Sequence, residues 1–214
     1  MNYADTKKTL LFVGASGALA ERVIPLLASH YEIVGVTHTS RTLANSMSRL
    51  YNGDLLSSHE ELFNDIFTAH KIDAVIWNPV RYFPMPLLES SRTILHTEFD
   101  LACALPLECV KSAMRHGWGT KGVSSGKTFV LITSLLAFGH KPHWGSYAIA
   151  KRAEVVLGEY LEKELAPYGI TMKTIALGEV PKISPPFLLE QLTRAIENAD
   201  TTTQLYKIDG DTLR

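Results

Sequence analysis

Short apolar segments alternate with longer amphipathic segments along the whole chain, and this alternation is the feature that most restricts its fold. Several apolar segments, among them TLLFV at 9–13 and KTFVLIT at 127–133, contain continuous apolar runs instead of one apolar residue in two. Such runs are typical of strands that are covered on both faces. The pattern therefore predicts an α/β fold: a doubly wound parallel sheet of about seven strands in a three-layer α/β/α domain.

The elements follow from the same pattern. The expected strands are 9–13, 32–37, a short one just before Asp54, 72–77, 127–133, 170–176 and 204–208. The expected helices run from the glycines after the first strand to about Ser29, and then over 41–50, 58–70, 98–116, 147–165 and 187–198, with Ser58 as an N-cap. Because ligands of such sheets bind beyond the carboxyl ends of the strands, functional residues are expected directly after them.

Composition restricts the class of protein. The 214 residues, 46% hydrophobic and 20% charged, suit one globular domain over 1–214 and exclude a disordered chain. A formal net charge of −1 gives no reason to expect nucleic acid or a membrane as partner. Cys103 and Cys109 are interpreted as buried free thiols, since six residues apart on a helix they face different directions. With no signal peptide and no apolar run of membrane-spanning length, a cytoplasmic location is expected.

A glycine-rich turn follows the first strand. In GASGALA at 14–20, Gly14 and Gly17 would let the backbone approach a pyrophosphate, and the following helix would direct its N-terminus at the negative charge. A tight turn without a ligand is the alternative. Cofactor contacts are expected from Gly14, Ser16, Gly17, Ala18 and Leu19.

The second strand ends in VGVTHTSRT, which lacks the acidic residue that often binds the ribose hydroxyls of NAD. Hydroxyl groups and a guanidinium instead suit the 2′-phosphate of NADP, which favours NADP over NAD. The expected contacts are Thr37, His38, Thr39, Ser40 and Arg41. Alternatively, Arg41 simply begins a solvated helix.

Three residues that could carry out catalysis follow the fifth strand. Ser134 ends this strand, and Tyr147 opens a helix on which Lys151 lies one turn further along the same face. A phenol has a pKa of about 10 and needs a nearby cation to act as an acid or base near neutral pH. A serine hydroxyl at the strand end can hydrogen-bond a substrate oxygen as charge develops on it.

The glycine-rich turn, Ser134 and the Tyr147-x-x-x-Lys151 pair together resemble the short-chain dehydrogenase/reductase superfamily over nearly the whole chain. The resemblance implies a cofactor site that also includes Asp54, Leu55, Asn78, Pro79, Val80, Thr133, Tyr147, Lys151, Gly178 and Val180. It also implies that Asp100 stands where the family has an asparagine of the proton relay, and that the helices at 98–116 and 147–165 form a homodimer or homotetramer.

By this resemblance, Tyr147 would be the general acid or base, Lys151 would lower its pKa and bind the nicotinamide ribose, and Ser134 would orient the substrate. The function expected is NADP(H)-dependent reduction of a small-molecule carbonyl to an alcohol, or the reverse. A non-catalytic NADP(H)-binding sensor or scaffold is the alternative, and an isomerase or dehydratase of the same fold is another.

Two further segments bear on the pocket. Only EVPKISP separates Gly178 from the next helix, so the region that covers the substrate in this family is expected to be truncated. His140 and His143 are interpreted as loop residues at the pocket mouth, since a proline lies between them and no third ligand is evident; no metal is expected.

Overall fold

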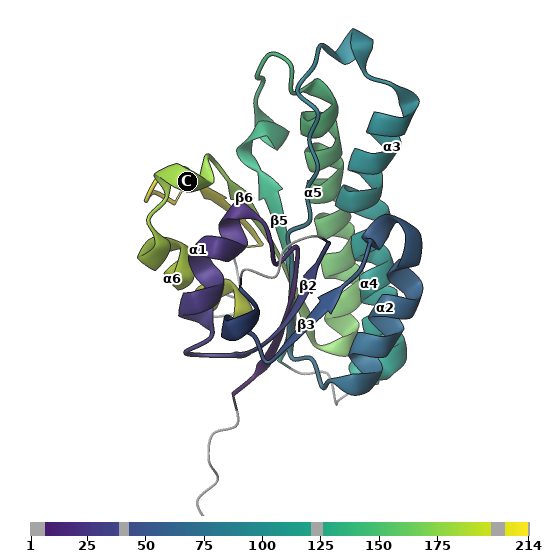
Figure 1. The fold of residues 1–214 in the computed structure, drawn as a ribbon, viewed down its shortest axis with the longest axis vertical. Helices are drawn as coiled ribbons and strands as arrows, with labels where there is room; N and C mark the ends of the chain where they lie inside the picture. The colour runs from purple at the N-terminus through teal and green to yellow at the C-terminus, as the bar shows by residue number, and fades with distance from the viewer. Residues whose placement is uncertain (1–6, 39–42, 121–125, 198–203, 214) are drawn as a thin grey trace, which may run out of the picture.

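The computed structural model describes residues 7–38, 43–120, 126–197 and 204–213. Seven parallel strands form one sheet in the order β3-β2-β1-β4-β5-β6-β7 (Figure 1). They are β1 Thr9–Val13, β2 Glu32–Thr37, β3 Arg49–Asn52, β4 Ala74–Trp77, β5 Lys127–Ser134, β6 Ile170–Leu177 and β7 Leu205–Ile208. The predicted doubly wound parallel sheet is confirmed. Strand order reverses between β1 and β4, which is where such sheets bind ligands.

Helices cover both faces of the sheet. They are α1 Ala18–Leu27, α2 Leu55–Ala69, α3 Arg92–Phe99, α4 Leu105–Ala113, α5 Gly145–Leu165 and α6 Pro185–Ile196. Helices α1 and α6 lie together on one face, and α2, α4 and α5 lie on the other, with α3 continuing the line of α4 (Figure 1). No helix in the described part of the chain is both long enough and apolar enough to cross a membrane.

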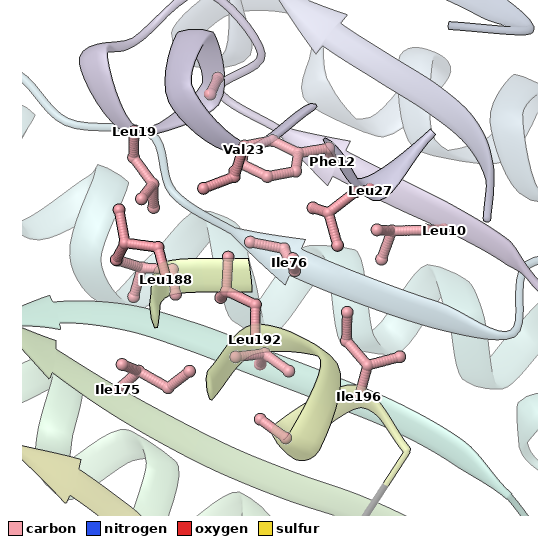
Figure 2. Close-up of a cluster of buried hydrophobic side chains, with 14 of the residues drawn as sticks. Leu10, Phe12, Leu19, Val23, Leu27, Ile76, Ile175, Leu188, Leu192 and Ile196 are labelled. Atoms are coloured by element: carbon pink, nitrogen blue, oxygen red, sulfur yellow. The ribbon is translucent and has the colours of Figure 1, made fainter. Parts of the chain in front are cut away.

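The two faces of the sheet have separate hydrophobic cores. In β1, Leu10 and Phe12 point toward α1 and α6, while Leu11 and Val13 point toward the opposite helices. Figure 2 shows the first of these cores, where Leu192 of α6 lies among side chains of the central strands. Because both faces are buried, both sets of alternate residues must be apolar, which explains the continuous apolar runs in the sequence.

The helix predicted over 41–50 is wrong. Within its described part there is only a single 3-10 turn, Ala44–Ser46, and Arg49 already begins β3. Strand β3 pairs with β2 in parallel, starting with Arg49 beside Val34. This pairing satisfies backbone groups at an edge of the sheet and prevails over local helix propensity.

The predicted N-cap of α2 is also wrong. The helix begins at Leu55, and the Asp54 carboxylate accepts a hydrogen bond of 3.1 Å from the backbone N–H of Leu56. Ser58 lies inside the helix with non-helical backbone angles (φ −139°, ψ 26°). Asp54 therefore does the capping that the sequence analysis assigned to Ser58.

The helix predicted over 98–116 is part of a longer helical stretch. It starts at Arg92, where the Ser91 hydroxyl caps the N-terminus by accepting from the N–H of Ile94. Two π-helical turns interrupt it, at Asp100–Ala104 and Met114–Trp118. In the first turn the carbonyl of Leu101 accepts a hydrogen bond of 2.8 Å from the indole of Trp77, which ties the helix to β4.

Replacing Asp54 should show which residue caps α2. Asp54→Ala is expected to lower the free energy of unfolding by about 0.5–2 kcal/mol, since it removes the acceptor at the helix N-terminus. Ser58→Ala, the matched control, should change it by less than about 0.5 kcal/mol. Urea unfolding followed by circular dichroism measures both, and a larger loss for Ser58→Ala than for Asp54→Ala would contradict the assignment.

Candidate active site and cofactor cleft

A cleft lies at the carboxyl ends of β1 and β4, where strand order reverses. It is lined by Gly14, Ser16, Gly17, Val36, Thr37, His38, Gly53, Asp54, Leu55, Leu56, Asn78, Pro79, Val80, Arg81 and Leu101. Many of the residues predicted to bind the cofactor are therefore in one place. Thr39, Ser40 and Arg41, which were predicted beside them, lie outside the described residues.

Gly14 shapes the floor of this cleft. Its backbone has a φ of +89°, and a Cβ atom there would lie 2.9 Å from the carbonyl of Asn78 and the nitrogen of Pro79. The N–H groups of Gly14 and Ala15 both donate to the carbonyl of Val36, at 3.0 and 2.8 Å. Only glycine fits this turn, and its small size keeps the backbone open to an approaching group.

The N-terminus of α1 faces the same cleft. Gly17 caps this helix without a side-chain hydrogen bond, and Ala18 opens its first turn. The first N–H groups of a helix lack intrahelical partners and attract an anion. The side chain of Leu19 is buried in the core beneath α1, so only its backbone can contact a ligand here.

The opposite end of the cleft is lined by polar groups that follow β2 and β3. Thr37 is buried, and its carbonyl accepts from the N–H of Gly53 at 3.0 Å. The exposed His38 ring lies 4.0 Å from the Asp54 carboxylate, and Leu55 is the next residue along the chain. Asp54 and Leu55 therefore line the same cleft as Gly14, and their contact with an adenosine stays a prediction.

Ser134, Tyr147 and Lys151 come together beside the cleft. The Ser134 hydroxyl accepts from the N–H of Leu136 at 3.2 Å and shares a hydrogen bond with the Tyr147 side chain. The Lys151 ammonium lies 6.0 Å from the centre of the Tyr147 ring. A small pocket that contains Tyr147 and Lys151 shares Pro79, Val80 and other lining residues with the cofactor cleft. The phenol and the ammonium therefore border a region that is continuous with the cleft.

The Lys151 side chain forms polar contacts with β5 and with its own helix. Its ammonium donates to the carbonyl of Ile132 at 3.1 Å and to the Glu154 carboxylate at 2.8 Å, and Glu154 is completely buried. The sequence analysis missed Glu154. Its only signal was a Lys-x-x-Glu spacing, which is common on exposed helices and therefore does not indicate a buried pair.

The electrostatic surroundings of Tyr147 keep its phenol protonated. Burial raises its pKa above the ordinary value, and the Lys151 ammonium opposes this effect. The Glu154 and Glu98 carboxylates raise the pKa of Tyr147 further, whereas its hydrogen bond with Ser134 lowers it. Tyr147 is therefore suited to donate a proton at neutral pH.

The acid that lies close to Tyr147 on the α3 side is Glu98 and not Asp100. Glu98 is buried and lines the small pocket with Tyr147. Burial raises the pKa of its carboxyl, and the nearby Ser146 side chain and Phe83 backbone partly oppose this. Asp100 begins the first π-helical turn, and among the described residues its carboxylate has no hydrogen bond or ion pair.

Three other predicted cofactor residues lie away from the glycine-rich turn. The Thr133 hydroxyl is buried and donates to the carbonyl of Lys151 at 3.1 Å. The N–H of Gly178 donates to the carbonyl of Ile208 at 2.8 Å, beside β7. Val180 packs against the core under α1 and α6. Thr133 thus helps to place α5, while Gly178 and Val180 lie at the end of β6.

An aromatic cluster borders Tyr147 on the solvent side. The ring centres of Tyr82 and Trp144 are 4.8 Å apart, and they lie 6.2 and 5.7 Å from that of Tyr147. A hydrogen bond of 2.9 Å from the N–H of Met85 to the carbonyl of His143 joins the two loops. No group of three metal-binding side chains occurs in the described part of the chain.

Comparisons with known proteins agree with this fold. No family model matches the chain. Its sequence is 24% identical to the 3-oxoacyl-[acyl-carrier-protein] reductase FabG of Rickettsia felis, over 89% of this chain and 80% of that protein. It is 23% identical to 3-amino-tetrahydro-pyrrolizinone reductase of Xenorhabdus hominickii, over 82% of this chain and 62% of that protein. A short-chain dehydrogenase from Streptomyces avermitilis has the same fold (TM-score 0.82, 16% identity, covering 97% of this chain and 90% of that one).

The chain thus has the Rossmann-like α/β fold of solved short-chain dehydrogenase/reductase structures. Another solved structure of the same fold, described as an NAD(P)-dependent gluconate 5-dehydrogenase from Beutenbergia cavernae, has a TM-score of 0.82 and 17% identity, covering 96% of each chain. That structure contains bound NADP.

The thiol nearest the site should react slowly. Burial raises the pKa of Cys103 to about 11, with Glu154 adding to the shift and Lys151 opposing it. At pH 7.5 only about one thiol in a thousand or fewer is ionised, so alkylation by iodoacetamide should be slow and should accelerate as pH rises toward 11. Mass spectrometry of the alkylated peptide measures the rate, with urea-unfolded protein as control; folded protein that reacts as fast as unfolded protein at pH 7.5 would contradict this.

Proposed function

We propose that this protein is an NADP(H)-dependent oxidoreductase that reduces a carbonyl to an alcohol, or carries out the reverse reaction. The observation that carries the proposal is the meeting of Ser134, Tyr147 and Lys151 beside a cleft whose glycine-rich turn is open. A dinucleotide fits the residues present, because a side chain at position 14 would collide with the Asn78–Pro79 backbone and only glycine leaves the turn free.

The residues would divide the work as follows. When bound, the nicotinamide supplies or accepts the hydride. The Tyr147 hydroxyl donates a proton to the carbonyl oxygen of the substrate, and Ser134 hydrogen-bonds that oxygen as it gains charge. Ser134 can do so because its own oxygen accepts from Leu136, which fixes the side chain. Lys151 supports the phenol with a positive charge and would bind the nicotinamide ribose.

The raised pKa of Tyr147 favours the reductive direction. Reduction of a carbonyl needs a protonated acid, while oxidation of an alcohol needs a phenolate. Burial and two carboxylates keep Tyr147 in the protonated form at neutral pH. We therefore place carbonyl reduction ahead of alcohol oxidation.

NADP is the preferred cofactor in this proposal. The sequence after β2 offers no carboxylate for the adenosine ribose and supplies Arg41, whose guanidinium suits a 2′-phosphate. The related structure from Beutenbergia cavernae binds NADP. Asp54 at the other side of the cleft would lie near the adenine, with Asn78 beside the pyrophosphate turn.

The substrate would be a small carbonyl compound that enters past the aromatic cluster of Tyr82, Trp144 and Tyr147. Only residues 178–184 lie between β6 and α6, so we propose one domain with a truncated cover over an open pocket. Exposed apolar side chains on α5, Val156 and Tyr160 among them, would be buried in a homodimer or homotetramer. Leu101, Leu105 and Val155 belong to the core and cannot contribute to that surface.

A non-catalytic NADP(H)-binding protein is the second candidate. Two observations favour it: Lys151 is held by a buried carboxylate, and Asp100 replaces the asparagine expected of the proton relay. Turnover separates the two candidates, because both bind the cofactor.

Removing the phenol hydroxyl tests catalysis. Tyr147→Phe is expected to lower kcat for NADPH-dependent reduction by about 100-fold or more, the typical contribution of a general acid. The dissociation constant of NADPH should stay within about a factor of three, since the ring remains. Tyr31→Phe, which removes a phenol hydroxyl that contacts Glu197 and lies outside the lining of the cleft, is the control. Reduction at the wild-type rate by Tyr147→Phe would sink the assignment of the acid.

Removing the guanidinium tests the cofactor preference. Arg41→Ala is expected to weaken NADPH binding by about 10- to 100-fold, the effect of losing charge-assisted hydrogen bonds worth about 1.5–3 kcal/mol. NADH binding in the same variant should be unchanged, since NADH lacks the 2′-phosphate. Fluorescence titration with both nucleotides measures this, and equal weakening of the two would argue against a 2′-phosphate contact.

A further inference from the structure

Lys151 and Glu154 form an ion pair inside the protein. The nitrogen and oxygen are 2.8 Å apart, and the side chains are 6% and 0% exposed. The ammonium also donates a hydrogen bond of 3.1 Å to the Ile132 carbonyl. Removing charges from water is costly, and a buried charge without a partner neutralises by changing its protonation state. Each member of this pair therefore stabilises the charge of the other.

The pair lies in line with the reacting phenol. Tyr147, Lys151 and Glu154 are four and then three residues apart on α5, and such spacing places them on one face of the helix. The Lys151 ammonium lies between the Tyr147 ring on one side and the Glu154 carboxylate on the other, and both groups raise the pKa of Lys151. A group that keeps the Lys151 ammonium charged therefore also affects the pKa of the Tyr147 phenol.

Few other groups could balance the charge of Lys151. The turn 100–104 presents Cys103, whose thiol has its pKa raised to about 11 and is neutral at physiological pH. Helix α3 presents Glu98, which acts on Tyr147. Strand β5 presents the Ile132 carbonyl and the Thr133 hydroxyl, neither of which is charged. Glu154 is the one carboxylate within 4.0 Å of the Lys151 nitrogen in the described part of the chain.

We propose that Glu154 is a positioning residue of the active site: it is the buried counter-ion that keeps Lys151 charged and directed beside Tyr147. This inference rests on the proposed function, in which Lys151 supports the phenol. It adds a fourth side chain to Ser134, Tyr147 and Lys151, and this buried carboxylate contacts Lys151 directly.

The direction of the effect follows from the pair. Burial by itself lowers the pKa of Lys151, and the Glu154 carboxylate reverses this and raises it above its ordinary value. In Glu154→Gln the carboxylate is gone, and burial becomes the largest influence on the pKa of Lys151. This pKa should therefore fall, and the ammonium should lose its proton at a lower pH than in the wild type. Tyr147 would then lose its neighbouring cation, and activity should fall at a pH where the wild type is still active.

The first experiment observes the ammonium directly and needs no turnover. Full-length protein labelled with ¹⁵N-lysine is titrated from pH 6 to 10 by NMR, and the Lys151 signal is assigned by its loss in Lys151→Arg. In wild type and in Glu159→Gln, an exposed control on the same helix, Lys151 should stay charged. In Glu154→Gln its pKa should fall by about two units or more, a size typical of buried lysines.

The second experiment measures kcat/KM for NADPH-dependent reduction against pH. The alkaline fall of activity in Glu154→Gln should begin at least about one pH unit lower than in the wild type. Glu154→Asp keeps the carboxylate and should restore most of the wild-type profile. If Glu154→Gln does not fold, Glu154→Leu, which also removes the carboxylate, takes its place.

The inference is overturned if Lys151 stays charged up to pH 10 in Glu154→Gln, or in Glu154→Leu where only that variant folds. The inference is also overturned if Glu154→Gln lowers the melting temperature but leaves the pH profile unchanged, because Glu154 would then contribute only to stability. If the NMR titration behaves as expected but no carbonyl is reduced by the wild type, the proposed function fails while the counter-ion role stands.

Discussion

Two hydrogen bonds between α5 and β5 fix the candidate site. Lys151 donates its ammonium proton to the Ile132 carbonyl, and the Thr133 hydroxyl donates to the carbonyl of Lys151. Because each element supplies a donor and an acceptor, the helix has one position along the strand. Ser134 is the last residue of β5, next to Thr133, and Tyr147 lies one turn before Lys151 on α5. The distance between hydroxyl and phenol therefore depends on this contact, as does the position of both beside the cleft.

Much of the fold could be predicted from the sequence, because continuous apolar runs are required wherever both faces of a sheet are buried. The glycine-rich turn was also predictable, since a φ of +89° and a backbone 2.9 Å away demand glycine at position 14. The segment 41–50 was misread because β3 owes its existence to pairing with β2, a contact distant from the local pattern. The N-cap was misplaced because both Asp54 and Ser58 suit that role, and only the backbone geometry separates them.

The site was predictable as a set of residues but not as an electrostatic environment. Ser134, Tyr147 and Lys151 stand at spacings that the sheet and one helix face bring together. The sequence does not indicate that Glu154 and Glu98 are buried, because a glutamate on an amphipathic helix ordinarily lies in solvent. Their burial beside a phenol and an ammonium arises from packing between α3, α5 and the sheet. Both acids raise the pKa of Tyr147 in addition to the larger effect of burial, so the chemistry depends on contacts that the pattern of residue types does not reveal.

The central claim is that the phenol, the ammonium and the hydroxyl meet at the reactive face of a bound dinucleotide. A crystal structure of the protein with NADPH tests it most directly. The account predicts the pyrophosphate on the turn at Gly14 and nicotinamide C4 close enough to Tyr147 for one carbonyl group to contact both, each approach being about 3–3.5 Å. A nicotinamide ring directed away from Tyr147, or NADPH bound elsewhere on the protein, would contradict it.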